Sequence, residues 1–106
     1  MSKLKRNKPE IIKEMLGVIL LNRNILATRL LYKANLSPNM FKDYTKELVE
    51  KKLISETITD KKEILNGRKS KPGHKIFNLT ELGRQYLEDY KAVELFLEKY
   101  GLIEEQ

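Results

Sequence analysis

The spacing of apolar residues changes abruptly at Thr80. In the stretch KIFNLTELGRQYLEDY, residues 75–90, apolar and polar side chains alternate before Thr80, which is typical of a β-strand. Beyond it the apolar positions Leu82, Tyr86 and Tyr90 recur every four residues, which is typical of a helix. Threonine is a good helix N-cap. The sequence therefore predicts a strand over 75–79 that runs directly into a helix ending near Tyr100.

The predicted strand needs a partner, and residues 53–60 can supply it. This segment, LISETITD, is rich in β-branched residues and alternates in polarity. The stretch between the two strands is basic and holds two turn dipeptides, Asn66-Gly67 and Pro72-Gly73. We therefore predict a β-hairpin with a long basic tip.

Three helices are predicted ahead of the hairpin. The first covers 9–22, with Pro9 at its first position, where the missing N–H costs nothing. The second covers 25–34 and ends at Asn35, a residue that tolerates the left-handed conformation of a sharp turn. The third begins after an N-cap at Ser37. The residues expected to face the core are Ile11, Ile12, Met15, Leu16, Ile19, Leu20, Leu26, Leu30, Leu31, Ala34, Met40, Phe41, Tyr44 and Leu48.

This element order, α-α-α-β-β-α, is that of a winged helix-turn-helix fold, mainly α with a β-hairpin. A chain of 106 residues suits one modest core. We predict a basic N-terminal arm over 1–8, a winged helix-turn-helix domain over 9–80 and a long C-terminal dimerisation helix within 81–106.

The positive charge is concentrated in two segments. The net charge is +6, and residues 1–8 and 60–75 each carry +4, so the rest of the chain carries −2. Residues 80–106 are acidic, with seven carboxylates against three bases. This asymmetry indicates a polyanionic partner on one side of the molecule. The alternative for either basic segment is a solvated tail that only aids solubility.

Several classes of protein are disfavoured. The chain has no cysteine, no phosphate-binding glycine loop and no HExxH motif, so we expect neither cofactor nor metal site. His74, the single histidine, has no evident catalytic partner, and we do not expect an enzyme. The N-terminus lacks a signal-peptide pattern, and the longest apolar run, Val18–Leu21, is too short to span a membrane. We expect a cytoplasmic, nucleoid-associated protein.

Two stretches resemble archaeal winged-helix DNA-binding proteins: ATRLLYKANLSPNMFKDYTKELVEKKLI and IFNLTELGRQYL. Within them, TRLLYKANLS, LTELG and the following YL are most similar to a small, dimeric, chromatin-associated family of crenarchaea. The resemblance covers roughly residues 10–100. It implies a double-stranded DNA-binding protein, either a transcriptional regulator or a chromatin protein, whose C-terminal helix forms an antiparallel coiled coil in a homodimer. This chain differs in a longer, more basic wing and a shorter last helix.

The candidate DNA contacts lie on three segments. A helix fits the major groove, and the helix after Ser37 is expected to direct a polar face away from the core. The hairpin tip is expected to meet the DNA backbone or minor groove. The N-terminal arm could add phosphate contacts. The predicted residues are Ser37, Asn39, Lys42 and Lys46 on the helix, Arg68, Lys69 and Lys71 in the wing, and Lys5 and Arg6 in the arm.

The last helix carries the apolar spacing of a coiled-coil seam. Its start, at Leu82 and Tyr86, is expected to pack on the chain's own first helix, whereas its end outruns a core of this size. The predicted dimer interface comprises Tyr90, Val93, Phe96, Leu97 and Tyr100. The alternative function is a winged-helix protein–protein interaction module that docks through the acidic last helix.

Overall fold

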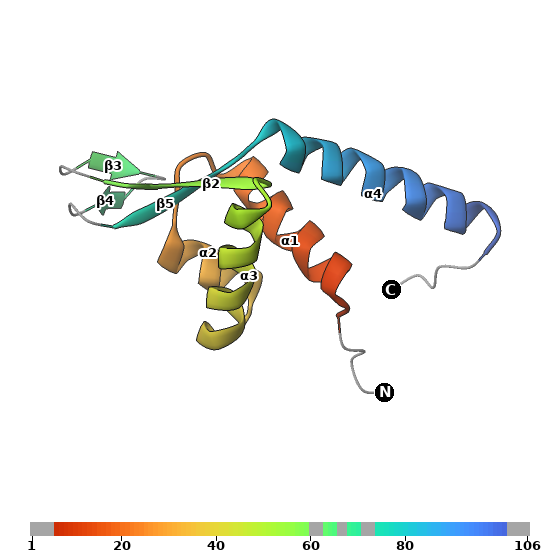
Figure 1. Cartoon of the computed structure of the whole chain (residues 1–106), viewed down its shortest axis with the longest axis horizontal. Coiled ribbons are helices and arrows are strands. Elements are labelled where there is room, and N and C mark those ends of the chain that lie inside the picture. The colour runs from red at the N-terminus through yellow and green to blue at the C-terminus, as the bar shows by residue number, and fades with distance from the viewer. Residues whose placement is uncertain (1–5, 60–62, 66–67, 71–73, 102–106) are drawn as a thin grey trace.

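The computed structural model describes residues 6–59, 63–65, 68–70 and 74–101. Figure 1 shows a bundle of helices and strands from which one long helix extends to one side and a β-hairpin to the other. The chain measures 51 × 32 × 25 Å. The elements in order are α1 (Lys8–Leu21), β1 (Ile25–Leu26), α2 (Ala27–Ala34), α3 (Pro38–Glu50), β2 (Ile54–Ile58), β3 (Glu63–Leu65), β4 (Arg68–Ser70), β5 (Lys75–Leu79) and α4 (Glu81–Lys99).

The predicted winged helix-turn-helix architecture is confirmed, and its local signals act as expected. The side chain of Ser37 accepts a hydrogen bond from the backbone N–H of Met40, so it caps α3. Asn35 adopts the left-handed conformation, with φ 57° and ψ 50°, and ends α2. The side chain of Thr80 accepts a hydrogen bond from the backbone N–H of Gly83 at 3.0 Å, and α4 begins directly after Thr80, at Glu81.

One predicted boundary is wrong, and the first helix is shifted by one residue from its predicted range. The segment expected to open the second helix instead forms β1, which pairs antiparallel with β5 through Ile25↔Phe77 and Leu26↔Ile76. Asn24, with a positive φ of 55°, turns the chain before this pairing. The first helix starts at Lys8, because Asn7 caps it and forms a capping box with Glu10. Lys8 therefore belongs to the helix and not to an arm.

The strands form two small sheets. In the first, β5 lies between β1 and β2, and β2 pairs with β5 from Ile54↔Leu79 to Ile58↔Lys75. In the second, β3 pairs with β4 from Glu63↔Ser70 to Leu65↔Arg68. In Figure 1 the second sheet lies at the end of the β2–β5 hairpin that is far from α4. The predicted basic tip is thus built on a ladder of its own.

The core lies between the first three helices and the face of the β1-β5-β2 sheet that they cover. Two residues expected in it are surface residues: Leu20 is 39% exposed, and Met40 is 42% exposed. Leu20 lies in the last turn of α1. Met40 lies in the first turn of α3, which is the end of α3 farthest from the sheet (Figure 1). The fully enclosed side chains are Phe77, Met15, Leu16, Ile19, Ile25, Leu30, Leu48 and Ile54.

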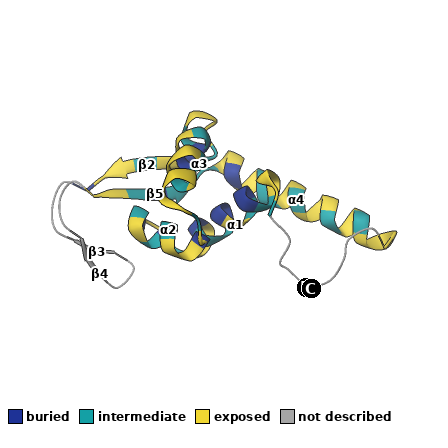
Figure 2. Cartoon of the chain, turned by 90° about the horizontal axis from the view of Figure 1, so that it is seen from below, coloured by how far each residue is buried: buried dark blue, intermediate teal, exposed yellow. Residues whose placement is uncertain are grey.

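α4 packs on α1 along only part of its length. The hydroxyl of Tyr86 donates to the backbone carbonyl of Pro9 at 2.9 Å, and Lys13 forms an ion pair with Glu94 at 2.8 Å. Beyond this pair, large apolar side chains lie on the surface, as the yellow end of α4 shows in Figure 2. None of the helices among the described residues is long and apolar enough to cross a membrane.

Candidate nucleic-acid interface

α3 presents an exposed polar face next to its buried side. Leu48 and Thr45 face inward, and the Thr45 hydroxyl donates to the carbonyl of Phe41 at 2.9 Å. Asn39, Lys42 and Lys46 are all exposed, and the two lysines lie beside Thr45 on the helix surface. Neither lysine forms an ion pair with any residue that the structure describes. Their ammonium groups are therefore available to an external anion.

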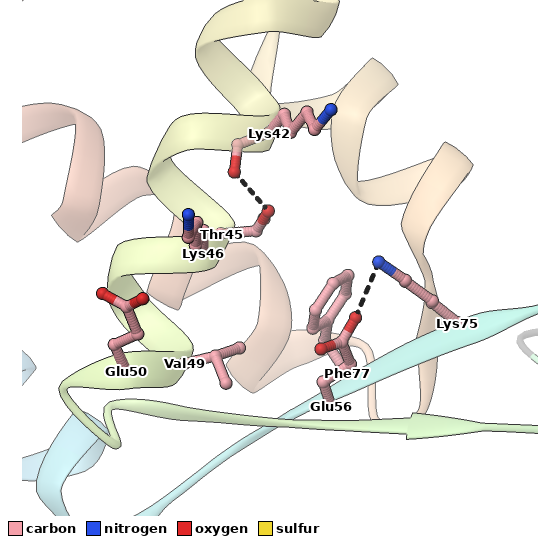
Figure 3. Close-up of a pocket in the computed structure, with 8 residues that line it drawn as sticks. All are labelled: Lys42, Thr45, Lys46, Val49, Glu50, Glu56, Lys75 and Phe77. Atoms are coloured by element: carbon pink, nitrogen blue, oxygen red, sulfur yellow. Dashed lines mark hydrogen bonds and ion pairs between the residues drawn. The ribbon is translucent and has the colours of Figure 1, made fainter.

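A groove separates α3 from the β2–β5 hairpin. Its volume is about 260 Å³. Figure 3 shows apolar side chains of α3 and β5 in the groove, with charged groups around it. The lining residues are Lys42, Thr45, Lys46, Val49, Glu50, Glu56, Lys75 and Phe77. Three ammonium groups thus border one groove together with two carboxylates.

Lys75 is a candidate contact that was not singled out from the sequence. Its Nζ lies 3.0 Å from a carboxylate oxygen of Glu56 on the neighbouring strand. Strand residues two apart lie on one face, so the inward position of Phe77 also places Lys75 on the side of α3. That signal was present in the sequence. The two lysines of α3 and Lys75 therefore line the same groove.

The wing residues are placed only in part. Arg68 and Lys69 lie in β4, where they pair with Leu65 and Ile64 respectively. Lys71 lies outside the described residues. At the base of the tip, the N–H of Thr59 donates to the carbonyl of His74 at 2.9 Å, and the N–H of His74 donates to the Thr59 hydroxyl. The backbone of His74 thus closes the hairpin below the tip.

The N-terminal arm differs from its prediction. Lys5 lies outside the described residues, whereas Arg6 is bonded within the chain. Its guanidinium donates to the carbonyls of Ala34 at 3.2 Å and Asn35 at 3.1 Å, and it pairs with Glu14. Arg6 is therefore held against the end of α2 and is not part of a free arm.

Lys8 also has a partner within the chain. Its Nζ lies 2.9 Å from a carboxylate oxygen of Glu47 on α3. This hydrogen bond is the main cause of a lowered pKa of the Glu47 carboxyl, to which the more distant Lys51 also contributes. Arg6 and Lys8 are the two cations of the predicted arm that the structure describes, and both contact other helices of the chain.

The predicted dimer residues divide into two groups. Tyr90 is half-buried: its ring stacks on Tyr86 with centroids 6.0 Å apart and lies under the ammonium of Lys13. Burial raises the pKa of both tyrosines. Leu97 is half-buried as well. The remaining members are open to solvent, with exposed fractions of 55% for Val93, 59% for Phe96 and 59% for Tyr100.

The position of Leu82 differs from the predicted one. It was expected on the chain's own core but is 52% exposed. It borders a shallow pocket of about 310 Å³ between α4 and the residues that follow α3, together with Leu53 and Tyr86. Val93, Phe96 and Tyr100 form an exposed apolar stripe at the far end of α4. Leu82 lies on the same side of the helix near its start, but the exposed polar residues Gln85 and Asp89 separate it from the stripe.

The described residues hold no group of three or more histidine, cysteine, aspartate or glutamate side chains arranged to bind a metal ion. The α3 face and the groove can bind anions and can form hydrogen bonds with the surface of a partner.

Comparison with known proteins agrees with this architecture. The family model for the winged helix-turn-helix matches residues 5–98. No curated protein matches the sequence. Among solved structures, Sso10a-2, a DNA-binding protein from Sulfolobus solfataricus, is 20% identical, with a TM-score of 0.56 over 90% of this chain and 88% of that one.

Two bacterial structures are also similar. A mutant of S. aureus MepR bound to an oligodeoxyribonucleotide is 15% identical, with a TM-score of 0.63, and the match covers 85% of this chain and 60% of that one. ZitR, a zinc-responsive MarR family member from Lactococcus lactis, is 19% identical, with a TM-score of 0.60, and the match covers 93% of this chain and 61% of that one. The chain thus spans about 60% of the length of these two proteins. It belongs to the winged helix-turn-helix family.

Proposed function

We propose that the chain binds double-stranded DNA as a dimeric transcriptional regulator or chromatin-associated protein in the cytoplasm, associated with the nucleoid. The observation that carries this proposal is the exposed face of α3, where Asn39, Lys42 and Lys46 lie on the surface and neither lysine has an ion-pair partner among the described residues. Two proteins of similar fold support it: one was solved with an oligodeoxyribonucleotide, and the other is described as DNA-binding. We assign the chain a binding role and not a catalytic one.

α3 is the element proposed to enter the major groove. A helix about 10–12 Å across fits a groove about 12 Å wide. Asn39, in the first turn, can bond adenine through two hydrogen bonds, and Lys46 can reach guanine or a phosphate. The hydroxyl of Ser37 and the nearby start of α3 favour a phosphate, because a helix N-terminus attracts anions.

The wing is proposed to bind the flanking backbone or minor groove. Arg68, Lys69 and Lys71 would neutralise phosphates there. Lys75 extends this set towards α3, because it lines the same groove as Lys42 and Lys46. Lys5 remains a proposed contact of the N-terminal segment, which we place at residues 1–7, followed by a winged domain that extends to Thr80.

α4 is proposed to form the homodimer. The exposed apolar stripe lies at the far end of α4, and Leu82 lies on the same side of the helix near its start. Monomeric proteins rarely leave several large apolar side chains clustered at one end of a helix uncovered. An antiparallel α4 from a second copy would cover it under two-fold symmetry, with the far end of each stripe close to the partner's Leu82. Tyr90 and Leu97, both half-buried, would lie at the edge of this interface.

The same helix supports one alternative, a protein–protein interaction module. The apolar stripe lies on the acidic part of the chain, since residues 80–106 hold seven carboxylates against three bases. A basic partner with an apolar face could dock there. This role requires no affinity for DNA.

A titration of duplex DNA separates the two functions. One duplex has a random sequence and the other comes from upstream of the chain's own gene, and both are measured at several salt concentrations. DNA binding through lysines and arginines should weaken steeply as salt rises, because bound phosphates release their counterions. Absence of duplex binding at low salt would refute the proposal and favour the interaction module.

A further inference from the structure

The end of α1 at which the described chain begins contacts each of the other three helices. We call residues 6–9 the N-terminal junction. Arg6 bonds to carbonyls at the end of α2, Lys8 pairs with Glu47 of α3, and the carbonyl of Pro9 accepts the hydroxyl of Tyr86 from α4. A short stretch of chain thus joins elements that are otherwise far apart in the sequence.

Arg6 makes the most extensive of these contacts. Its Nη1 lies 3.2 Å from the carbonyl oxygen of Ala34, and its Nη2 lies 3.1 Å from that of Asn35. The last carbonyls of a helix lack partners within the helix, and a cation near them is favoured by the helix dipole. The carboxylate of Glu14 pairs with the same Nη1 that bonds to Ala34. The side chain is 29% exposed, so it is partly enclosed by its partners.

The bonded carbonyls lie at the turn of the helix-turn-helix. Ala34 is the last residue of α2, and Asn35 reverses the chain in its left-handed conformation. Only Leu36 separates Asn35 from Ser37, the N-cap of α3. A contact that fixes the backbone at Asn35 therefore fixes the position from which α3 starts.

We propose that Arg6 is a positioning residue for α3 and not a DNA contact. It holds the α2–α3 turn against α1, so that α3 presents Asn39, Lys42 and Lys46 in a constant orientation. Lys8 supports the same helix further along, through Glu47. The proposal rests on DNA binding as the proposed function, and it assigns Arg6 a role different from that of the other cations near the N-terminus.

The test compares Arg6→Ala and Arg6→Lys with the wild type in duplex binding at several salt concentrations, under conditions where circular dichroism shows each variant folded. Arg6→Ala should bind roughly tenfold more weakly at every salt concentration, because α3 would no longer be held in one orientation. The slope of log affinity against log salt should stay unchanged. Arg6→Lys should recover only part of the affinity, because an ammonium group cannot bond to both carbonyls in the geometry of the guanidinium. Lys91→Ala is the control, since it removes the same charge from an exposed position on α4 that makes none of these contacts.

Two results of this experiment would overturn the assignment. A slope that falls by about 0.9 per chain in Arg6→Ala and returns in Arg6→Lys would make Arg6 a phosphate contact. An unchanged affinity with only a lower melting temperature would leave it a purely structural role.

Amide hydrogen exchange without DNA tests Arg6 independently of the proposed function. The N–H groups of Met40 and Phe41 bond to the side chain and the carbonyl of Ser37. Their exchange should become several-fold faster in Arg6→Ala, and unchanged exchange would refute the proposal. If wild type bound no duplex, the proposed function would fail, but this exchange measurement would still decide whether Arg6 fixes the start of α3.

Discussion

Gly83 in α4 lies directly against the backbone of Leu53, the residue before β2. A Cβ on Gly83 would lie 2.3 Å from the carbonyl oxygen of Leu53 and 2.6 Å from a methyl carbon of Leu79. Thr80 bonds to the same carbonyl, through its N–H at 3.3 Å and its hydroxyl at 2.9 Å. The start of α4 is thereby fixed to the segment that joins α3 to the wing.

The first prediction is that Gly83→Ala destabilises the fold. The added methyl group would meet a backbone oxygen, which cannot move aside as the end of a flexible side chain could. We expect a loss on the order of 1–3 kcal/mol in the free energy of unfolding, measured by urea denaturation. Gly17→Ala is the control, because a Cβ at Gly17 in α1 has no atom within 4 Å. It should be neutral or stabilise by up to about 1 kcal/mol, since alanine favours a helix over glycine. Equal effects of the two substitutions would contradict the close packing at Gly83.

The second prediction concerns the pH dependence of the Lys8–Glu47 pair. The hydrogen bond from Lys8 lowers the pKa of Glu47 below its ordinary value of 4.5. A carboxyl whose pKa is lowered by folding stabilises the folded state above its unfolded pKa, and this contribution is lost as pH falls through the folded pKa. Lys8→Gln should therefore be less stable than wild type at neutral pH, and the difference should disappear once Glu47 is protonated.

Urea denaturation of both proteins across this pH range gives the measurement. Lys51→Gln is the control: Lys51 lies 3.4 Å from the same carboxylate and contributes less to its pKa than Lys8 does, so its difference should be smaller. A stability difference for Lys8→Gln that is the same at neutral and strongly acidic pH would show that the charge of Glu47 does not cause it.

The features that the sequence predicted correctly depend on local chemistry. Ser37 and Thr80 cap helices through hydrogen bonds that span only three residues, and Asn35 adopts a conformation that few other residues tolerate. Such features are visible in a short window of sequence. The strand at 75–79 was also predicted with its observed bounds, because a turn dipeptide precedes it and the helix cap Thr80 ends it.

The missed features depend on contacts between distant residues. β1 has two residues, too few to show a period, and it is defined only by its pairing with β5. Arg6 was assigned to a free arm because its partners at Ala34 and Asn35 lie 28 and 29 residues away. Leu82 has the spacing of a core residue, but only the packing of α4 determines that its side chain stays on the surface.

The third prediction is a steep salt dependence of DNA affinity. Each neutralised phosphate contributes about −0.9 to the slope of log affinity against log salt, so a dimer should show a slope on the order of −4 to −8. Replacing Arg68, Lys69 and Lys71 together by glutamine should flatten the slope, and adding Lys75→Gln should flatten it further. Lys91→Gln, on α4, should leave it unchanged. An affinity that scarcely changes with salt would refute the electrostatic interpretation.

The fourth prediction assigns sequence preference to α3. Asn39→Ala and Lys46→Ala should each reduce the preference between specific and random duplexes by roughly 1–3 kcal/mol if the side chain contacts a base edge. Both residues are exposed, so circular dichroism should show an unchanged fold. Lys33→Ala removes an exposed lysine from α2 and should leave the preference unaltered. If footprints and relative affinities of the α3 variants matched those of wild type, α3 would not be the element that recognises sequence.

The fifth prediction is a homodimer formed through α4. With 19 residues, α4 is about 28 Å long, and its far end carries Val93, Phe96 and Tyr100 on the surface. Two antiparallel copies would bury these side chains and place two α3 helices on one side, where they could enter successive major grooves about 34–36 Å apart.

Leu97→Glu and Val93→Glu should each yield a folded monomer with much weaker DNA binding, because a carboxylate in the apolar contact would lose its hydration without gaining a partner. Val93 is 55% exposed, so its substitution should disturb the monomer little. Lys91→Gln changes the charge by the same amount on another side of α4 and should remain dimeric. Light scattering at matched concentrations measures the mass: a wild-type value near 12.5 kDa at high micromolar concentration would refute the dimer, together with the paired placement of the α3 helices.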